Sequence, residues 1–210
     1  MANATWWNLP DEKRARITEA AMVEFGTRGF SAGSLNVIAS QAGIAKGSLF
    51  QYFEDKLDFY VTICEHVASE IEQAVISTLR PDAGLFDNLR HIVKQWMRYF
   101  REHPIERRIA YASLYEIEPD VRAIVRAVPN ARHKAALEPL ISAAAAQGQL
   151  RPDVDERMVL SMTTIVLRHL NSGPFDPAGD VGIPMHELPD STVNRWALAY
   201  VDVLEAAFAA

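Results

Sequence analysis

The segment from Gly43 to Ser48 contains two glycines, a lysine and a serine, which are residue types that can hold a phosphate group. A phosphate-binding loop of the P-loop type places its lysine after the last glycine and follows a β-strand. Here Lys46 precedes Gly47, and no strand pattern leads into the segment. We therefore reject a nucleotide-binding loop, and these residues must be considered together with the helices around them.

The other reactive residues do not indicate catalysis or metal binding. The six histidines show no metal-ligand spacing such as His-x-x-x-His, and a single cysteine, Cys64, excludes an intrachain disulfide or a Cys-x-x-Cys site. Neither a Gly-x-Ser-x-Gly nor a Gly-x-Gly-x-x-Gly motif is present. The sequence therefore predicts a protein that is not an enzyme and has no metal or cofactor.

The composition is that of an ordinary globular protein. Of the 210 residues, 49% are hydrophobic and 23% are charged, which excludes disordered and collagen-like classes. Residues 1–10 lack a basic start followed by an apolar run, and no stretch of about 18 apolar residues occurs. With one cysteine, a reducing compartment is the default. We expect a cytoplasmic protein without a membrane segment.

The elements that position these residues are predicted to be helices. Apolar residues recur at spacings of three and four, and alternating strand patterns are scarce, which predicts an all-α fold. Gly29 can end the first helix, and Ser34 and Asp55 are suitable N-caps for later helices, whereas Pro139 should kink or interrupt its helix. The predicted helices span 11–28, 35–42, 46–53, 56–79, 86–102, 104–117, 119–127, 130–147, 153–170 and 190–209, and an irregular segment spans 171–189.

Residues 42–45, Ala-Gly-Ile-Ala, join two short helices in the way that a helix-turn-helix unit requires. Gly43 can take the positive φ of a sharp turn, and Ile44 can be buried beneath it. Helix pairs with a glycine turn are common, however, and from this spacing alone a purely structural role is favoured by about two to one. The spacing alone therefore does not assign a function to the turn.

A longer run of residues favours DNA binding. The stretch from Arg14 to His66 closely resembles the N-terminal domain of the TetR family of bacterial transcriptional regulators. The segment Ala45-Lys-Gly-Ser-Leu-Phe-Gln-Tyr-Phe53, followed by Lys56, is similar to the family signature Ser-Lys-Gly-Thr-Leu-Tyr-x-Tyr-Phe-x-x-Lys. The resemblance implies a three-helix helix-turn-helix DNA-binding domain over 11–60 and a helical ligand-binding and dimerisation domain over 61–210. The other matching residues are Ile17, Ala20, Ala21, Phe25, Gly29, Phe30, Ser34, Ile38, Ala39, Ala42, Gly43 and Leu57.

The resemblance also implies which residues contact DNA. Lys46, Gly47 and Ser48 would begin the recognition helix, where free N–H groups and short side chains can approach phosphates or base edges in the major groove. Gln51 would read a base, because a side-chain amide can pair with both N7 and N6 of adenine. Further implied phosphate contacts come from Ser34, which can also cap its helix, from Lys56, and from the hydroxyl of Tyr52, for which a packing role is a close alternative.

Two residues depart from the family pattern. Ala45 stands where the family often has Ser or Thr, so a helix cap worth about 1 kcal/mol and a potential phosphate contact are missing. Phe50 stands where Tyr is usual, so a hydroxyl is lost but a thymine-methyl contact can still form. We expect both departures to change affinity and sequence preference more than the fold.

The last two predicted helices carry more apolar surface than one subunit can bury. Only one stripe of each helix can face the subunit's own core, so the other needs a partner. A homodimer through these two helices is the simplest arrangement and is also the family's habit. One pair of stripes is Met158, Met162, Ile165, His169 and Trp196, Tyr200, Val203, Ala207; the adjacent pair is Val159, Thr163, Val166, Leu170 and Ala197, Val201, Leu204, Phe208.

The resemblance, together with the large aromatic residues between Trp96 and Tyr115, implies a ligand pocket in the second domain. Such a set suits an aromatic or fatty ligand, although most aromatic and methionine stripes are ordinary core. The candidate ligand-binding residues are Trp96, Phe100, Tyr111, Tyr115, Met158 and Met162. The chemical identity of the ligand cannot be read from these residues.

The charge distribution qualifies the DNA-binding prediction. A net charge of −6 argues by itself against nucleic-acid binding, since such domains are usually basic. Residues 1–60, however, hold six Lys and Arg against seven Asp and Glu, so most of the negative charge lies in the rest of the chain. We expect few phosphate contacts, weak non-specific affinity and a shallow salt dependence.

These features together predict a ligand-responsive repressor. Its dimer would bind a palindromic double-stranded DNA operator and be released when a small-molecule effector in the second domain tilts the fourth helix. The alternative is a helical small-molecule-binding or enzymatic protein with a vestigial DNA-binding domain. Substitution of Lys56 and Gln51 would distinguish the two.

Overall fold

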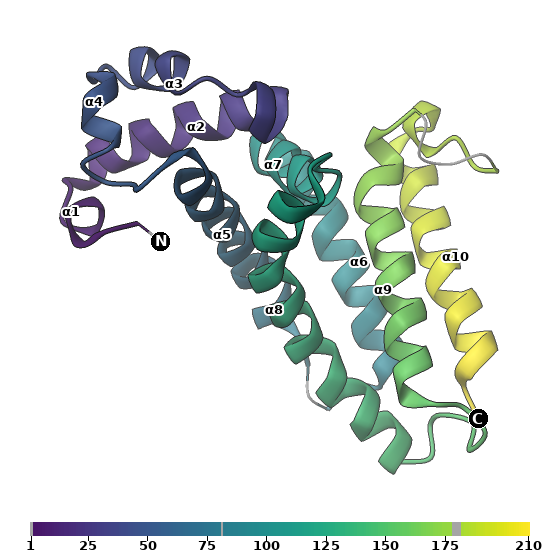
Figure 1. Cartoon of the computed structure of the whole chain (residues 1–210). Coiled ribbons are helices and arrows are strands. Elements are labelled where there is room, and N and C mark those ends of the chain that lie inside the picture. Colours follow the sequence, from purple (N-terminus) through teal and green to yellow (C-terminus); the bar gives the residue numbers. More distant parts are fainter. Residues whose placement is uncertain (1, 81, 178–181) are drawn as a thin grey trace. The chain divides into compact units, whose positions relative to one another are not determined.

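The computed structural model describes residues 2–80, 82–177 and 182–210, and these ranges contain helices and no strand (Figure 1). The one β-type contact among them is an isolated antiparallel bridge between Leu150 and Ala209. The predicted all-α fold is confirmed. The α-helices are α1 (Ala4–Trp7), α2 (Asp11–Ala32), α3 (Leu35–Gln41), α4 (Lys46–Leu49), α5 (Lys56–Val75), α6 (Leu85–Glu102), α7 (Pro104–Leu114), α8 (Pro119–Ala146), α9 (Glu156–Ser172) and α10 (Asp190–Phe208).

Helix α8 differs most from the prediction. It runs without a break from Pro119 to Ala146, although two helices were predicted there and both Pro129 and Pro139 lie inside it. Each proline removes one backbone hydrogen bond and disfavours the helix. The buried side chains on this helix, Leu137 and Ile141 among them, supply the tertiary packing that offsets this cost.

Several helix boundaries also differ from the prediction: α4 ends at Leu49, α5 at Val75 and α7 at Leu114, rather than at 53, 79 and 117. α2 continues to Ala32, but its helical conformation is interrupted at Gly29, which has φ 68° and ψ −174°. α9 begins at Glu156 rather than at 153, because the Asp155 side chain accepts a hydrogen bond from the Arg157 N–H. The helix α1 was not predicted at all.

The chain divides into two compact units. The first contains the residues up to Glu70 together with Glu102–Asn130, and the second contains Ile71–Arg101 and Ala131–Ala210. The helices α5 and α8 therefore contribute to both units. The helix-turn-helix region lies in the first unit, and this unit also includes α7. These units are defined by packing, and the functional boundary between residues 60 and 61 stays a prediction.

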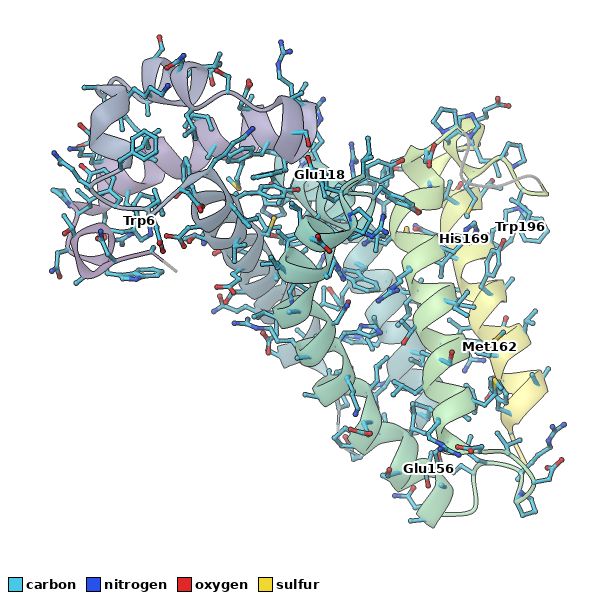
Figure 2. The ribbon with its side chains drawn as sticks, in the orientation of Figure 1. Trp6, Glu118, Glu156, Met162, His169 and Trp196 are labelled. Atoms are coloured by element: carbon cyan, nitrogen blue, oxygen red, sulfur yellow. The ribbon has the colours of Figure 1, made fainter. Side chains whose placement is uncertain are left out.

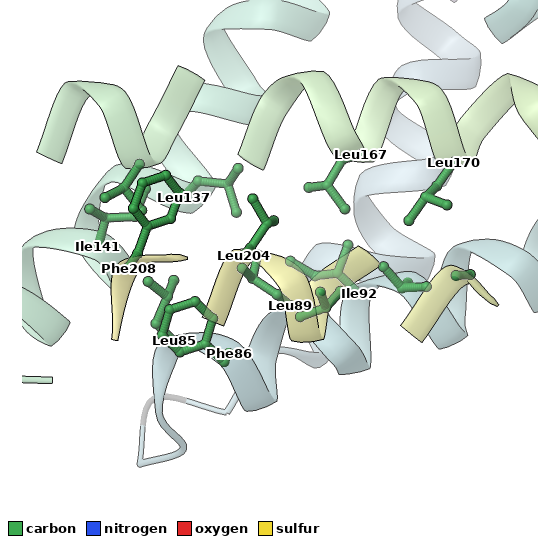
Figure 3. Packing of buried hydrophobic residues seen from close by; sticks show 14 of the residues in the cluster. Leu85, Phe86, Leu89, Ile92, Leu137, Ile141, Leu167, Leu170, Leu204 and Phe208 are labelled. Atoms are coloured by element: carbon green, nitrogen blue, oxygen red, sulfur yellow. The ribbon is translucent and has the colours of Figure 1, made fainter. Parts of the chain in front are cut away.

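The second unit is built around one apolar core (Figure 3). It receives leucine, isoleucine and phenylalanine side chains from α6, α8, α9 and α10. Since full burial of one such side chain stabilises the fold by about 1.5–3 kcal/mol, this core holds the four helices together. The labelled members in Figure 3 are Leu85, Phe86, Leu89, Ile92, Leu137, Ile141, Leu167, Leu170, Leu204 and Phe208.

The segment predicted to be irregular has short ordered turns at both ends. The 3₁₀ turn η2 spans Gly173–Phe175, and the 3₁₀ turn η3 spans Met185–Glu187. A further 3₁₀ turn, η1, lies elsewhere in the chain, at Ile76–Thr78 directly after α5. Met185 is 1% exposed and belongs to the core of the second unit. The middle of the segment, 178–181, lies outside the described residues.

Candidate nucleic-acid interface

The turn between α3 and α4 has the backbone geometry of a helix-turn-helix unit. Gly43 has a φ of 66°, a left-handed conformation that suits glycine. The Gly43 N–H donates to Ser40 O (3.2 Å), and the Ile44 N–H donates to Ala39 O (2.9 Å). These two bonds form a Schellman motif, which ends α3 and turns the chain toward α4. The predicted positive φ of Gly43 is confirmed, whereas Ile44 is only half-buried.

The recognition helix α4 is short and accessible. It spans four residues, and Ala45 before it makes no side-chain cap, as its departure from the family pattern predicts. The free N–H groups at the start of the helix can therefore meet an external acceptor. The exposed residues in and after α4 are Lys46, Gly47, Phe50 and Gln51, and Ser48 is half-buried.

Tyr52 is less accessible than the residues before it. It is 3% exposed, and the centroid of its ring lies 6.1 Å from that of Trp6. Lys13 Nζ lies 5.7 Å from the Tyr52 ring centroid, within the range of a cation–π contact. This burial favours the packing role for Tyr52, and its contact with a phosphate stays a prediction.

Ser34 caps α3 as predicted. Its Oγ accepts a hydrogen bond from the Val37 N–H (3.4 Å), while its own N–H donates to Glu24 Oε1 (2.9 Å). Glu24 is 6% exposed, and Arg28 Nε lies 3.5 Å from the same oxygen. Because a buried carboxylate is costly unless it is paired, these contacts make Glu24 the residue that joins the start of α3 to α2.

Lys56 stands at the start of α5 and reaches back to the end of α2. Its Nζ donates to Ser31 O (3.1 Å) and lies 4.9 Å from the ring centroid of Phe30. Burial lowers the pKa of Lys56, and the nearby carboxylates of Glu118, Glu116 and Glu24 oppose this by raising it. An ammonium group has three N–H donors, so one bond to Ser31 is compatible with the predicted phosphate contact.

Two glutamates after α7 contact the same end of α2. Glu116 Oε2 accepts from the Phe30 N–H (3.2 Å), and the Glu118 carboxylate accepts from the Ser31 hydroxyl (Figure 2). Glu116 is 5% exposed, and its Oε1 accepts from the N–H groups of Ile117 (2.9 Å) and Glu118 (3.3 Å). Sequence reasoning missed both glutamates because their partners lie 86 and 87 residues away.

The aromatic candidates for ligand binding form two separate pairs. The rings of Trp96 and Phe100 on α6 are stacked with centroids 6.5 Å apart, in the second unit. The rings of Tyr111 and Tyr115 at the end of α7 are 4.6 Å apart, in the first unit. Their role in a ligand site stays a prediction. A cavity of about 370 Å³ in the second unit is lined by other residues, namely Gly84, Leu85, Phe86, Asp87, Gln149, Glu205 and Ala209.

The two apolar stripes predicted on α9 and α10 have different environments in the structure. The buried stripe includes Val159, Thr163, Leu170, Ala197, Val201, Leu204 and Phe208. The exposed stripe includes Met158 (55%), Met162 (38%), Ile165 (57%), Trp196 (38%) and Val203 (66%), of which Met162 and Trp196 are labelled in Figure 2. The prediction that only one stripe faces the subunit's own core is confirmed. The two methionines lie on the exposed stripe, which suits a partner surface better than the wall of a pocket.

The described residues hold neither a membrane span nor a metal cluster. None of their helices combines the length and hydropathy needed to cross a bilayer. Within the same ranges, His, Cys, Asp and Glu side chains nowhere gather in a group of three that could hold a metal ion.

The sequence of the helix-turn-helix region matches a known family. Residues 17–62, which contain most of α2, all of α3 and α4 and the start of α5, match the family model described as bacterial regulatory proteins, tetR family. The transcriptional activator FasR of Mycolicibacterium smegmatis is 28% identical over 121 residues, which are 58% of this chain and 55% of FasR. The match thus spans little more than half the length of that relative. Other curated relatives are described as transcriptional repressors.

Solved structures share the fold over nearly the whole chain. A TetR-family transcriptional regulator from Chloroflexus aurantiacus is 23% identical and covers 100% of this chain and 99% of its own, with a TM-score of 0.68. AibR, in complex with isovaleryl coenzyme A and operator DNA, is 22% identical, covers 90% of this chain and 97% of its own, and also has a TM-score of 0.68. The helix-turn-helix region of this chain, residues 17–62, therefore matches the TetR family of bacterial regulatory proteins.

Proposed function

We propose that this chain is a ligand-responsive transcriptional regulator that binds double-stranded operator DNA. The observation that carries the proposal is the accessible surface of α4, entered through the turn at Gly43, within the residues that match the family. Gln51 would read a base, while Lys56 and the N–H groups at the start of α4 would contact phosphates. The proposed regulator is a cytoplasmic protein and not an enzyme.

The test is a selection of genomic DNA fragments with the purified protein, followed by measurement of the dissociation constant at several salt concentrations. Specific binding with a shallow salt slope is expected, because the first 60 residues hold only six Lys and Arg. Failure to obtain a specific, salt-dependent complex with any fragment would reject the proposal.

Two substitutions test the assigned contacts. Gln51→Ala should relax selectivity at one base position by about 1–3 kcal/mol, whereas Lys56→Ala should weaken binding to all sequences and lower the salt slope by about 1. Gln73→Ala and Lys134→Ala are matched controls, because both residues are exposed and lie outside the matched family residues. If neither Gln51→Ala nor Lys56→Ala changes regulation in cells, the alternative of a vestigial DNA-binding domain is favoured.

We also propose that the regulator is a homodimer formed through α9 and α10. The exposed stripe on these helices supports this, because a contiguous apolar surface favours contact with a partner. A two-fold dimer would present two copies of α4 to a palindromic operator, with half-sites about 34–36 Å apart or a multiple of that distance.

The proposed small-molecule effector would act as the signal that releases a repressor from its operator. In support, α7 and the start of α8 pack in one compact unit with the helix-turn-helix region, and Glu116 contacts the end of α2. A change in α7 or α8 on ligand binding would therefore reach the DNA-reading helices. Isovaleryl coenzyme A, the ligand named for AibR, is a suitable first probe. Effector activity requires that the probe dissociate the operator complex, since a ligand shifts an equilibrium only through its different affinities for the two states.

A further inference from the structure

The residues from Asn3 to Leu9, which we call the leading segment, contact the turn that follows the recognition helix. Asn3 Nδ2 donates to Gln51 O (2.7 Å), and the Asn3 backbone N–H donates to Tyr52 O (3.0 Å). Both carbonyl groups lie beyond Leu49, the last residue of α4, so their hydrogen-bond donors must come from outside the helix. The leading segment lies outside residues 17–62, which match the family model.

Asn3 also organises the leading segment itself. Its Oδ1 accepts hydrogen bonds from the N–H groups of Thr5 (2.9 Å) and Trp6 (3.3 Å) and so caps α1. One side chain therefore has two separate functions: the acceptor holds α1, and the amide donor holds the end of the recognition segment. A substitution that keeps the acceptor but removes the donor can separate them.

Trp6 adds an apolar contact to these hydrogen bonds. Its side chain, labelled in Figure 2, is 2% exposed. The centroid of its ring lies 4.8 Å from that of Phe53 and 6.5 Å from that of Phe59. Phe53 follows α4 and Phe59 lies in α5, so Trp6 packs against both sides of the connection between these helices. The far end of the segment is held by Arg14, whose Nη1 donates to the carbonyl oxygens of Trp7 (3.3 Å) and Leu9 (3.2 Å).

The recognition helix needs such support from outside. It has only four residues, includes Gly47 and has no side-chain N-cap, and a helix of this length is not stable by itself. The contacts of Asn3 fall on the carbonyl groups of Gln51 and Tyr52, directly beside the side chain assigned to base reading. The orientation of Gln51 therefore depends on a segment 48 residues away in the sequence.

We propose that Asn3 and Trp6 are positioning residues that hold the recognition helix in its DNA-reading orientation, so that the leading segment determines operator specificity without reading bases itself. The segment contains no Lys or Arg, and we assign it no phosphate contact of its own. This inference rests on the proposed function.

The test compares two asparagines of the 210-residue chain. Asn3→Asp keeps the acceptor that caps α1 but removes the Nδ2 donor to Gln51 O, whereas Asn8→Asp makes the same chemical change at an exposed residue of the same segment. The two variants therefore have the same net charge. Binding is measured with the DNA fragment selected by the wild-type protein and with an unrelated duplex, and hydrogen exchange is measured at the amides of residues 50–53.

Asn3→Asp should weaken binding to the selected fragment by about three- to tenfold relative to Asn8→Asp, the loss expected for one hydrogen bond. Binding to the unrelated duplex should be equal in the two variants, and exchange should be faster at residues 50–53 in Asn3→Asp only. Trp6→Phe, which retains an aromatic ring, should show an intermediate loss of specificity.

Equal specific affinity and equal exchange in Asn3→Asp and Asn8→Asp would overturn the inference. An equal loss of affinity for the selected and the unrelated duplex in Asn3→Asp would also overturn the inference, because a general loss of folded protein would have this result. If the wild-type protein selects no fragment, the proposed function itself fails, and the exchange measurement still decides whether Asn3 positions the recognition helix.

Discussion

Gly29 determines where the regular part of α2 ends. Its φ of 68° and ψ of −174° lie in a region that is essentially restricted to glycine. A Cβ atom at this position would have only Glu116 Oε2 within 4 Å, at 3.9 Å. Steric crowding by neighbouring residues is therefore not the reason that glycine is required. The requirement comes from the backbone, which places the Phe30 N–H where Glu116 accepts it.

Gly29→Ala is expected to lower the free energy of unfolding by about 1–3 kcal/mol, because an L-residue is strained in this conformation. Gly47→Ala is the control, since Gly47 is helical and a Cβ there meets nothing within 4 Å. The control should leave stability unchanged or raise it by about 0.5–1 kcal/mol. Urea denaturation followed by circular dichroism measures the stability of both variants. Equal denaturation midpoints would contradict the claim that the backbone conformation at position 29 requires glycine.

Cys64 and Tyr60 make the first unit sensitive to alkaline pH. Burial raises the pKa of the Cys64 thiol from 9.0 to about 12, and burial together with the neighbouring Cys64 raises the pKa of Tyr60. The folded protein therefore keeps protons that the unfolded chain loses above the ordinary pKa values. This stabilisation is complete below about pH 9 and is lost progressively as the pH rises toward the folded-state pKa.

The free energy of unfolding should accordingly fall as the pH rises above about 9, with a slope of up to about 1.4 kcal/mol per pH unit for each group. Urea denaturation between about pH 8 and about pH 10.5 measures this slope. Cys64→Ala should reduce the slope without removing it, since Tyr60 remains. A slope that is unchanged in Cys64→Ala would show that the thiol does not contribute.

At the scale of elements, the turn after α7 is joined to the end of α2 through carboxylates. Glu116 accepts three backbone N–H groups, from Phe30, Ile117 and Glu118, and is 5% exposed. The Arg122 side chain donates to the Glu116 carbonyl oxygen (2.7 Å) and holds the turn from the other side. The buried carboxylate therefore satisfies N–H groups on two elements at once.

Glu116→Ala should lower the free energy of unfolding by about 1–3 kcal/mol, because it leaves three part-buried backbone N–H groups without their acceptor. Glu118→Ala serves as the control. This exposed carboxylate bonds to the exposed Ser31, so its loss should cost under about 1 kcal/mol. Thermal unfolding of both variants measures the two losses of stability. Equal losses would show that the burial of Glu116 does not make its hydrogen bonds more important for stability than those of Glu118.

For the whole molecule, the second unit leaves one face of α9 and α10 without cover from its own core. The buried and exposed stripes lie side by side along both helices, so the fold of one chain buries only one of them. In water, exposed apolar area of this kind favours association with a partner. The proposed homodimer would remove this surface from solvent.

Ile165→Glu combined with Val203→Glu should convert the proposed dimer to a monomer in sedimentation equilibrium, because two charges would be buried without partners in the proposed interface. The two residues are 57% and 66% exposed, so the substitutions should not disturb the fold of one chain. The control is Ile117→Glu, since Ile117 is 87% exposed in the first unit. A double variant that sediments like the wild-type protein would exclude this interface.

Features that depend on neighbouring residues could be read from the sequence. The positive φ of Gly43, the cap at Ser34 and the cap at Asp55, whose Oδ1 accepts from the Asp58 N–H (2.8 Å), involve partners within a few positions. The stripes of α9 and α10 follow from helical periodicity alone. The continuity of α8 could not be predicted, since local propensity at Pro129 and Pro139 opposes the helix and only tertiary packing overrides it.

The sequence by itself thus determined the all-α fold, the glycine turn, the recognition segment and its resemblance to the TetR family, because each is encoded in short-range spacing. Only the tertiary structure revealed the residues that hold the recognition segment and its neighbouring helices in place. Asn3, Glu116 and Glu118 act on partners 48, 86 and 87 residues away. A hydrogen bond between residues so far apart in the sequence depends on how the whole unit packs, and no local sequence pattern predicts it.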